Sequence, residues 1–310
     1  MRYFLKLIRF QNLLMLAFMQ LLFRYGFLKL QHAPLSLNDW QYVLLILSTV
    51  FIAAAGYTIN NIYDQHTDSE NKPHDIIVGK HIPETMAYNI YIALNMTGVG
   101  IGFYLSNVIE KPAFAVIFIL IAATLYLYAT SLKQMLLIGN VIVALMLSFS
   151  VIIIGIFDLF PATFEGNQKE MATLFSILTD YAIFAFIVNF IREIVKDLED
   201  VDGDYNSGMS TLPIVLGISR VSKLVFGLSL LPIVVLLYYI NKYFIGSNLF
   251  ILAGYCLLFV VGPLLYFTIK VASAKKKQEF NHLSLVLKFV ILFGIISIAV
   301  LSYNLKYHNA

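Results

Sequence analysis

The chain has 310 residues, of which 60% are hydrophobic and only 13% charged, and its formal net charge is +3. Soluble domains carry about 25% charged residues, so this composition excludes an ordinary soluble protein, and the small, dispersed positive charge argues against a nucleic-acid partner. The single cysteine, Cys256, excludes an intrachain disulfide and a cysteine metal site. A membrane-spanning helix uses about 20 apolar residues, and we therefore expect a polytopic α-helical membrane protein.

Apolar runs of spanning length predict nine transmembrane helices. They lie near 10–30, 41–59, 86–107, 112–130, 135–156, 172–191, 222–241, 248–271 and 284–303. The first run follows Arg2, Lys6 and Arg9, but it is too long for a signal peptide and lacks a small-residue cleavage site. The expected fold is all-α, a single transmembrane domain over residues 1–310 in which nine helices form one bundle with cap loops on one side.

Lysine and arginine residues distinguish the two faces of this bundle. With nine spans, fifteen of the 21 fall on the N-terminal side, among them the run from Lys275 to Lys277, and six fall on the other side. Cytoplasmic loops carry the excess of positive residues. We therefore expect an integral protein of the inner (cytoplasmic) membrane, with its N-terminus and the loops on that side in the cytoplasm and its C-terminus outside.

Ten of the 18 acidic residues lie in two short windows, 60–80 and 192–208, which follow the second and sixth predicted helices. Both windows therefore belong on the cytoplasmic face. The first contains NNIYDQHTD and the second KDLEDVDGD, and polar residues recur in both at positions i, i+3 and i+7, which share one face of a helix. The matching residues are Asn61, Asp64 and Asp68 in the first window and Asp197, Asp200 and Asp204 in the second.

Like charges on one face of a membrane helix repel one another unless a cation lies among them. Mg²⁺ is the expected cation, because it takes oxygen ligands and is usually held by one or two carboxylates together with substrate phosphate oxygens. The candidate metal ligands are Asp64, Asp68, Asp200 and Asp204, with Asp197 as a further catalytic residue. Nearby basic residues would contact a diphosphate; they are Lys72, Lys133, Arg192 and Lys196.

Two simpler interpretations of these windows are less favoured. Acidic loops are often solvated surface, but two clusters with identical spacing on the same membrane face are harder to explain in that way. Asp200, Asp202 and Asp204 alternate as in an EF-hand calcium loop, yet the glycine is Gly203 rather than a glycine at loop position six, and position twelve is Thr211 rather than glutamate.

The sequence resembles the UbiA superfamily of intramembrane prenyltransferases over essentially the whole chain. That family has nine helices, with Asn-Asp-x-x-Asp-x-x-x-Asp after the second and Asp-x-x-Asp-x-x-x-Asp after the sixth, which here read NNIYDQHTD and DLEDVDGD. Further matches are NKP at 71–73, YATSLK at 128–133 and GMSTLPIVLG at 208–217. Three positions depart from the family pattern: Asn61 replaces its first aspartate, Asp75 replaces an arginine, and RFQN at 9–12 only approximates Arg-Pro-x-Asn.

The resemblance implies Mg²⁺-dependent transfer of a prenyl group from a polyprenyl diphosphate to a lipophilic acceptor, in membrane lipid and without an obligate protein partner. On the same basis, Asn12, Asn60 and Asn61 are expected to bind substrate. Departure of diphosphate from an allylic carbon leaves a carbocation, which aromatic faces can stabilise. Tyr128 is the main candidate for that role, and Tyr63 and Phe190 are further ones.

The identity of the acceptor is open at this point. REIVKDLEDVDGD together with STLPI is most similar to the branch that prenylates geranylgeranylglyceryl phosphate in ether-lipid synthesis. The alternative is an aromatic acceptor, 4-hydroxybenzoate or 1,4-dihydroxy-2-naphthoate, in quinone biosynthesis. A membrane transporter is a distant alternative, since transport sites usually lie near the bilayer midplane, whereas these acids cluster at one end.

Overall fold

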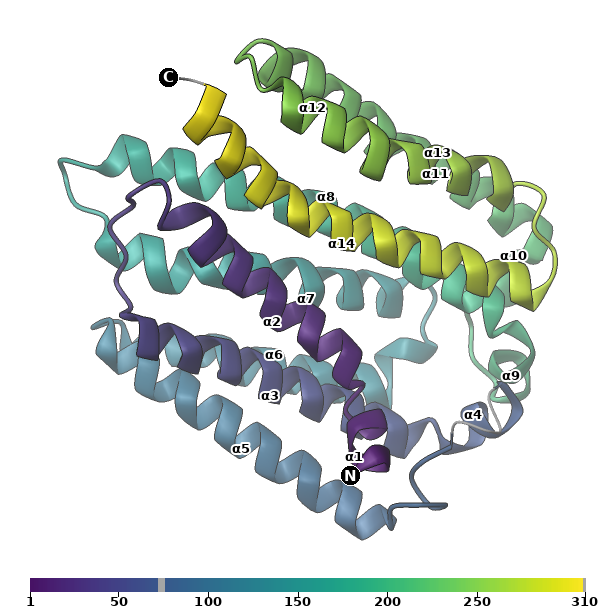
Figure 1. Cartoon of the computed structure of the whole chain (residues 1–310). Coiled ribbons are helices and arrows are strands. Elements are labelled where there is room, and N and C mark those ends of the chain that lie inside the picture. The colour runs from purple at the N-terminus through teal and green to yellow at the C-terminus, as the bar shows by residue number, and fades with distance from the viewer. Residues whose placement is uncertain (72–75, 309–310) are drawn as a thin grey trace.

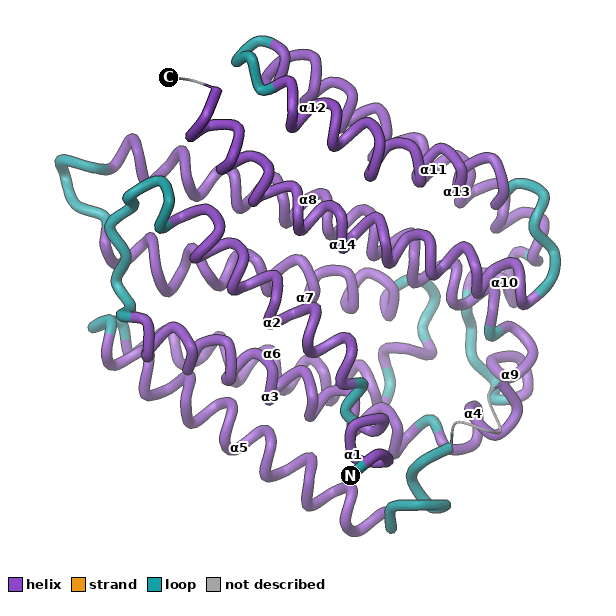
Figure 2. Tube along the Cα trace, viewed as in Figure 1, coloured by secondary structure: helices purple, strands orange, loops and turns teal. Residues whose placement is uncertain are grey.

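A computed structural model describes residues 1–71 and 76–308, which form a bundle of long helices that lie side by side along one direction (Figure 1). The connecting loops gather mainly at the two ends of the bundle (Figure 2), and the two termini lie at opposite ends. The long helices are expected in lipid, because only a helix satisfies all of its own backbone hydrogen bonds there.

The first half of the chain contributes seven α-helices and five shorter turns. They are α1 (Arg2–Leu7), α2 (Phe10–Phe23), η1 (Arg24–Leu28), α3 (Asp39–Tyr63), α4 (Gln65–Asn71), α5 (Glu84–Val108), η2 (Pro112–Phe114), α6 (Ala115–Thr130), η3 (Leu132–Gln134), α7 (Ile138–Ile154), η4 (Gly155–Leu159) and η5 (Phe160–Ala162). The turns η1 and η4 are π-helical and continue α2 and α7 without a break in the helix.

The second half follows the same pattern. It consists of α8 (Gln168–Glu199), α9 (Val201–Asn206), α10 (Leu212–Leu216), α11 (Ile218–Tyr239), η6 (Ile240–Ile245), α12 (Phe250–Cys256), η7 (Leu257–Val261), α13 (Gly262–Val271) and α14 (Lys277–His308). Here η6 extends α11, and η7 joins α12 to α13. The short helices α9 and α10 lie beyond the end of the bundle, as α4 does (Figure 1).

Each of the nine predicted apolar runs coincides with one long helix or with a chain of continuous helical pieces. Among the described residues, seven of these are long and apolar enough to span a membrane. The remaining two runs form α2 with η1, and α5, which carry polar side chains such as Gln20 and Asn95 within their length. The chain is therefore an all-α membrane protein, and the count of nine crossings stays a prediction.

Local sequence signals determine where several helices begin. At the start of α3, the Asn38 side chain accepts a hydrogen bond from the Gln41 backbone N–H, and the Gln41 side chain accepts one from the Asn38 backbone, both at 2.9 Å. This reciprocal pair is a capping box. Pro112 stands in the first turn before α6, where its missing N–H costs nothing.

The long helix α8 joins two apolar cores. Its N-terminal half packs with α2, α3 and α7 through residues such as Leu178, and its C-terminal half packs with α11, α13 and α14 through residues such as Val195, both fully buried. Because its last turns are buried in the second core, the end of α8 is held firmly where the second acidic motif begins.

A buried ion pair closes the end of the bundle opposite α4 and α9. The Arg24 guanidinium in η1 pairs with Asp158 in η4, and the two side chains are 1% and 0% exposed. Arg24 also donates to the Leu37 carbonyl at 2.5 Å, and Asp158 accepts from the Leu37 backbone N–H at 3.1 Å. These bonds connect three segments that are far apart in the sequence.

Removing one partner of this pair should destabilise the protein strongly, because a buried charge is then left uncompensated. We expect Asp158→Ala to reduce the free energy of unfolding by about 3–5 kcal/mol, measured as thermal unfolding in detergent. Lys29→Gln is the control, since Lys29 pairs with Asp39 at the surface of the same end and should change stability by less than about 1 kcal/mol. A stability loss of that small size in Asp158→Ala would contradict the structural role.

Candidate active site

Both acidic motifs lie at junctions between two helices. Asp64 separates α3 from α4 with φ/ψ of −89°/2°, and Asp200 separates α8 from α9 with −102°/13°. The helical bond pattern nevertheless continues through each junction: Asp68 N–H donates to the Asp64 carbonyl at 2.7 Å, and Asp204 N–H donates to the Asp200 carbonyl at 3.1 Å. Each motif therefore consists of two helical segments that meet at an aspartate, and helical hydrogen bonds run through the junction.

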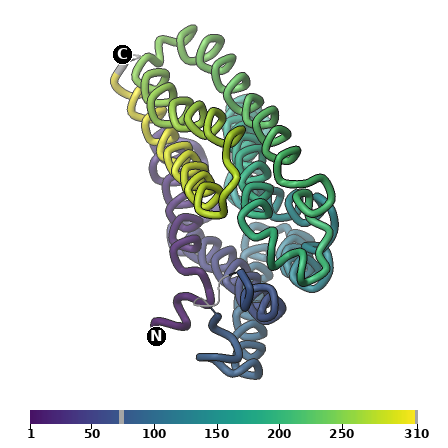
Figure 3. Tube along the Cα trace, turned by 90° about the vertical axis from the view of Figure 1, so that its right-hand side faces the viewer, coloured from purple at the N-terminus to yellow at the C-terminus, as the bar shows by residue number. Residues whose placement is uncertain are grey.

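The side chain of Asn71 ties the two junctions together. Its Oδ1 accepts from the Gly203 backbone N–H and its Nδ2 donates to the Asp200 carbonyl, both at 3.0 Å. A Cβ at position 203 would collide with this amide, so the glycine permits the close approach. Thr67 and Ser207 add a hydroxyl contact of 2.8 Å. As a result α4 and α9 lie side by side at one end of the bundle (Figure 3 views that end).

Between the two junctions lies a polar cavity of about 410 Å³, here called the acidic cavity. Its walls bring together nearly all of the residues that the sequence predicts for the site. These are Asn60, Asn61, Asp64, Asp68, Tyr128, Lys133, Lys196, Asp197, Asp200 and Asp204. Arg192 and Asn12 line a neighbouring cavity instead. Lys72 and Asp75 lie outside the described residues.

Cationic and amide groups accompany the carboxylates of this cavity. Lys133 forms an ion pair with Asp64, and the two side chains are only 9% and 16% exposed. The Asn60 amide also donates to Asp64, and the Asn140 amide donates to Asp197 at 2.8 Å. Lys277, at the start of α14, donates to the Asn71 carbonyl at 2.9 Å and lies 3.9 Å from Asp200 Oδ1. The repulsion expected from the sequence is thus reduced on both sides of the cavity.

Lys133 reaches the cavity because the segment between α6 and α7 folds tightly against the start of α7. Leu137 adopts a left-handed backbone conformation, with φ of 62°. Gly139 then passes so close that a Cβ there would lie 2.9 Å from the Cα of Lys133. Lys133 and Gly139 therefore belong to one compact turn that directs the lysine toward Asp64.

Asn61, which replaces an aspartate of the family pattern, has a contact that an aspartate could not make. Its Nδ2 donates to the Tyr57 carbonyl at 2.8 Å and to the Leu7 carbonyl at 3.2 Å. A carboxylate has no hydrogen to donate. The Asn61 amide therefore connects α1 to α3, and Asn61 also lines the acidic cavity.

The donor set of the acidic cavity fits Mg²⁺. Within residues 1–71 and 76–308, no three His, Cys, Asp or Glu side chains stand close enough to hold an ion by themselves. Mg²⁺ rarely needs such a cluster, because substrate phosphate oxygens complete its shell. Asn60 supports this fit: its Oδ1 is buried and has no hydrogen-bond partner among the described residues, a costly arrangement unless a ligand satisfies the oxygen.

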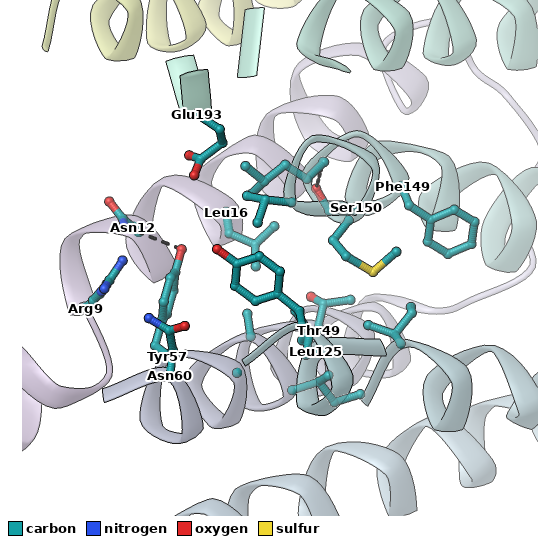
Figure 4. A pocket seen from close by; sticks show the side chains of 18 of the residues that line it. Arg9, Asn12, Leu16, Thr49, Tyr57, Asn60, Leu125, Phe149, Ser150 and Glu193 are labelled. Atoms are coloured by element: carbon teal, nitrogen blue, oxygen red, sulfur yellow. Dashed lines mark hydrogen bonds between the residues drawn. The ribbon is translucent and has the colours of Figure 1, made fainter. Parts of the chain in front are cut away.

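A second cavity of about 200 Å³ extends from the acidic cavity into the bundle and is here called the apolar cavity. Polar side chains, among them Asn60 and Glu193, gather at one end, and Leu125 and Phe149 lie toward the other (Figure 4). The two cavities share the lining residues Arg9, Asn60, Tyr128, Glu193 and Lys196. An elongated molecule with a polar head and an apolar tail would fit across both.

Only one of the three aromatic residues predicted from the sequence lines the two cavities. Tyr128 lines both cavities, whereas Tyr63 is 42% exposed and Phe190 packs in a hydrophobic core. Tyr57 also lines the apolar cavity and was not predicted from the sequence. Tyr57 lies one helical turn before Asn61, and that spacing was the available signal.

Other contributors were also missed. Glu193 was counted among the acids without a role, Asn71 was matched to a pattern without a function, and Asn140 was given no role. Lys277 was attributed to topology alone. The partners of Asn71, Asn140 and Lys277 are distant in the sequence, so no local pattern predicts these contacts. Glu193, by contrast, pairs with Lys196 one helical turn away, a spacing that was visible in the sequence.

Comparisons with known proteins show the family of the chain. The pattern of the UbiA prenyltransferase family matches residues 26–292. Digeranylgeranylglyceryl phosphate synthase of Korarchaeum cryptofilum is 34% identical over 63% of this chain, and the chain covers 63% of that relative, just under two thirds of its length. The synthase of the same name from Sulfurisphaera tokodaii is 32% identical over 72% of this chain and 76% of its own.

Solved structures share the fold. A UbiA homolog from Aeropyrum pernix K1 aligns with a TM-score of 0.65 at 16% identity, over 92% of this chain and 97% of its own. A UbiA homolog from Archaeoglobus fulgidus bound to GPP and Mg²⁺ aligns with a TM-score of 0.59 at 17% identity, over 96% and 99%. By its sequence pattern, its relatives and its helical fold, the chain belongs to the UbiA prenyltransferase family and is a membrane prenyltransferase.

Proposed function

We propose that the protein transfers a geranylgeranyl group from geranylgeranyl diphosphate to the hydroxyl of geranylgeranylglyceryl phosphate, with Mg²⁺, in ether-lipid synthesis. The observation that carries the proposal is the facing of two carboxylate motifs across one cavity that also contains Lys133. Relatives named digeranylgeranylglyceryl phosphate synthase support this acceptor. A structural neighbour bound to GPP and Mg²⁺ supports the donor class and the metal.

The residues of the acidic cavity suit the departure of a diphosphate. Asp64, Asp68, Asp200 and Asp204 would hold Mg²⁺, which when bound supplies electrostatic stabilisation of the leaving group. Lys133 adds a cation next to Asp64. The Thr211 hydroxyl lines the same cavity and has no hydrogen-bond partner among the described residues, so it is a further donor for a phosphate oxygen.

The apolar cavity suits the prenyl chain and its reactive carbon. The bond between C1 and the diphosphate oxygen breaks, and the diphosphate keeps the electron pair. The acceptor hydroxyl oxygen then bonds to C1, and the hydroxyl proton leaves through the acidic cavity. Apolar walls exclude water, which would otherwise capture the carbocation. Tyr128 and Tyr57 present aromatic rings to this space, where their faces favour positive charge.

We further propose nine membrane crossings, with the acidic cavity and the N-terminus facing the cytoplasm of a cytoplasmic membrane. The support is the excess of lysine and arginine on that side of the bundle. Water-soluble diphosphate would then leave directly into the cytoplasm, because α4 and α9 form the end of the molecule at which the cavity lies.

A product screen tests the reaction and its acceptor. Purified protein in lipid would receive Mg²⁺, geranylgeranyl diphosphate and one of three acceptors: geranylgeranylglyceryl phosphate, 4-hydroxybenzoate or 1,4-dihydroxy-2-naphthoate. Mass spectrometry should find the prenylated glyceryl phosphate. A prenylated aromatic acid alone would replace the proposed acceptor, and the absence of any Mg²⁺-dependent product from folded protein would refute the proposed reaction.

Single substitutions of the proposed metal ligands should nearly abolish turnover. We expect Asp64→Ala, Asp68→Ala, Asp200→Ala and Asp204→Ala each to lower kcat by on the order of 100-fold or more, the loss typical of removing one electrostatic stabiliser. Thermal unfolding should remain cooperative. Asp202→Ala is the matched control, because Asp202 lies between two of these residues but is exposed and outside the cavity. Near-normal kcat in all four variants would remove the metal assignment.

Lys133 should act mainly on the donor diphosphate. Lys133→Ala should raise KM for geranylgeranyl diphosphate by about 10-fold or more, the typical loss of a charge-assisted hydrogen bond, with a smaller fall in kcat. Steady-state kinetics at saturating acceptor measures this. Lys80→Ala is the control on the same side of the bundle, since Lys80 is exposed. An unchanged donor KM in Lys133→Ala would show that other cations hold the diphosphate.

A further inference from the structure

The polar end of the apolar cavity carries more positive than negative charge. Among its described lining residues, the cations are Arg9, Arg192 and Lys196, and the carboxylate is Glu193. Arg9 and Glu193 both lie at this polar end, with Asn12 and Asn60 (Figure 4). The lining of this cavity taken alone thus has two more positive than negative charges, although Arg9 and Lys196 also line the acidic cavity, where aspartates compensate part of their charge. Arg192 lines only the apolar cavity, and a cation beside apolar walls favours an anion next to it.

The Glu193 carboxylate forms ion pairs with two of these cations, Lys196 and Arg192. The Lys196 ammonium donates to both Glu193 oxygens, at 2.8 and 3.1 Å. Arg192 Nη1 lies 3.6 Å from Glu193 Oε1, and its Nε donates to the Ser284 carbonyl on α14 at 3.3 Å. Arg192 thus has further N–H donors to offer, because a guanidinium carries five.

Arg9 approaches the cavity from a different segment. It stands between α1 and α2 in a left-handed backbone conformation, with φ of 48°, which is uncommon for a residue with a side chain and recurs at functional sites. Its guanidinium lies over the Tyr57 ring, 5.2 Å from the centroid. Its positive charge also acts on the Glu193 carboxylate.

A fourth cation lies just behind this group. Lys288 on α14 donates to Asn12 Oδ1 at 3.1 Å, and Asn12 Nδ2 donates to the Tyr57 hydroxyl at 3.4 Å. These bonds connect α14, α2 and α3 around the cavity end. They hold the surroundings of Arg9 in place and add positive potential there.

This basic group overlaps the proposed diphosphate site at Arg9 and Lys196 and extends beyond it at Arg192. The aspartates of both motifs line the acidic cavity, where Lys133 is paired with Asp64. Arg192 lines the apolar cavity and not the acidic one. Because Arg9 and Lys196 line both cavities, an anion held here would lie next to the reacting carbon without being the leaving group.

We propose that Arg9, Arg192 and Lys196 bind the phosphate monoester of the acceptor lipid. This inference rests on the proposed function. A phosphate monoester carries about −1.5 to −2 charges at pH 7, so a group of three cations with one carboxylate suits it better than it suits an aromatic acid, which supplies a single negative charge. Arginine suits this task because its planar N–H pairs bind phosphate oxygens bidentately. The bound phosphate would place the acceptor hydroxyl beside Tyr128.

The test compares acceptors with and without the phosphate. Wild-type protein receives Mg²⁺, geranylgeranyl diphosphate and either geranylgeranylglyceryl phosphate or geranylgeranylglycerol, and the ratio of the two kcat/KM values is measured. We expect a wild-type ratio of about 10 to 100, typical of charge-assisted hydrogen bonds. Arg9→Gln and Arg192→Gln should each lower that ratio about tenfold, or to near one, by raising KM for the phosphorylated acceptor more than KM for the donor.

Two further variants keep the outcome interpretable. Arg192→Lys retains the charge and should recover part of the ratio even if a neutral substitution disturbs folding. Arg220→Gln, an exposed arginine at the start of α11, should leave the ratio at the wild-type value. A wild-type ratio near one, or a raised donor KM with an unchanged ratio in Arg9→Gln and Arg192→Gln, would overturn the phosphate site alone. The absence of transfer to either acceptor by wild-type protein would refute the proposed function itself.

Discussion

Mutual repulsion among carboxylates at one end of an apolar bundle is the constraint on which the rest of the site depends. Gathering Asp64, Asp68, Asp197, Asp200 and Asp204 around one cavity costs free energy in the absence of compensating charge. Lys133 and Lys277 supply part of that charge, and amide donors from Asn60 and Asn140 supply local hydrogen bonds. The remaining compensation is what a substrate that arrives with Mg²⁺ would provide.

The two acidic motifs share the same local structure, a bend between two helices at an aspartate. Each long helix, α3 and α8, bends at an aspartate and continues as a short helix that lies beyond the bundle. The bend lets α4 and α9 turn toward each other, while the preserved i to i−4 bonds keep the three polar positions on one face. Asn71 then fixes the distance between them. A rigid pair of junctions is needed because ligand positions must be held closely for metal chemistry.

The charges that line the two neighbouring cavities overlap in part. The acidic cavity carries the aspartates, Arg192 lines only the apolar cavity, and Arg9, Lys196 and Glu193 line both. Under the proposed function, the enzyme would have to keep two anionic head groups close together and distinguish them. The carboxylates would favour the group that binds with Mg²⁺, and the arginines would favour the phosphate of the acceptor.

The amino-acid sequence by itself determined the helices, the family and most of the acidic cavity. Apolar runs predict helices because lipid leaves a backbone no other hydrogen-bond partner than itself. The i, i+3, i+7 spacing predicts a common face because it follows from helix geometry alone. The tertiary structure alone decided the rest: that Tyr128 lines the cavity and Tyr63 does not, that Asn61 is tied to Leu7, and that Arg9 and Arg192 lie together. These contacts join residues separated by tens to hundreds of positions, so they depend on how whole helices pack, which local periodicity does not encode.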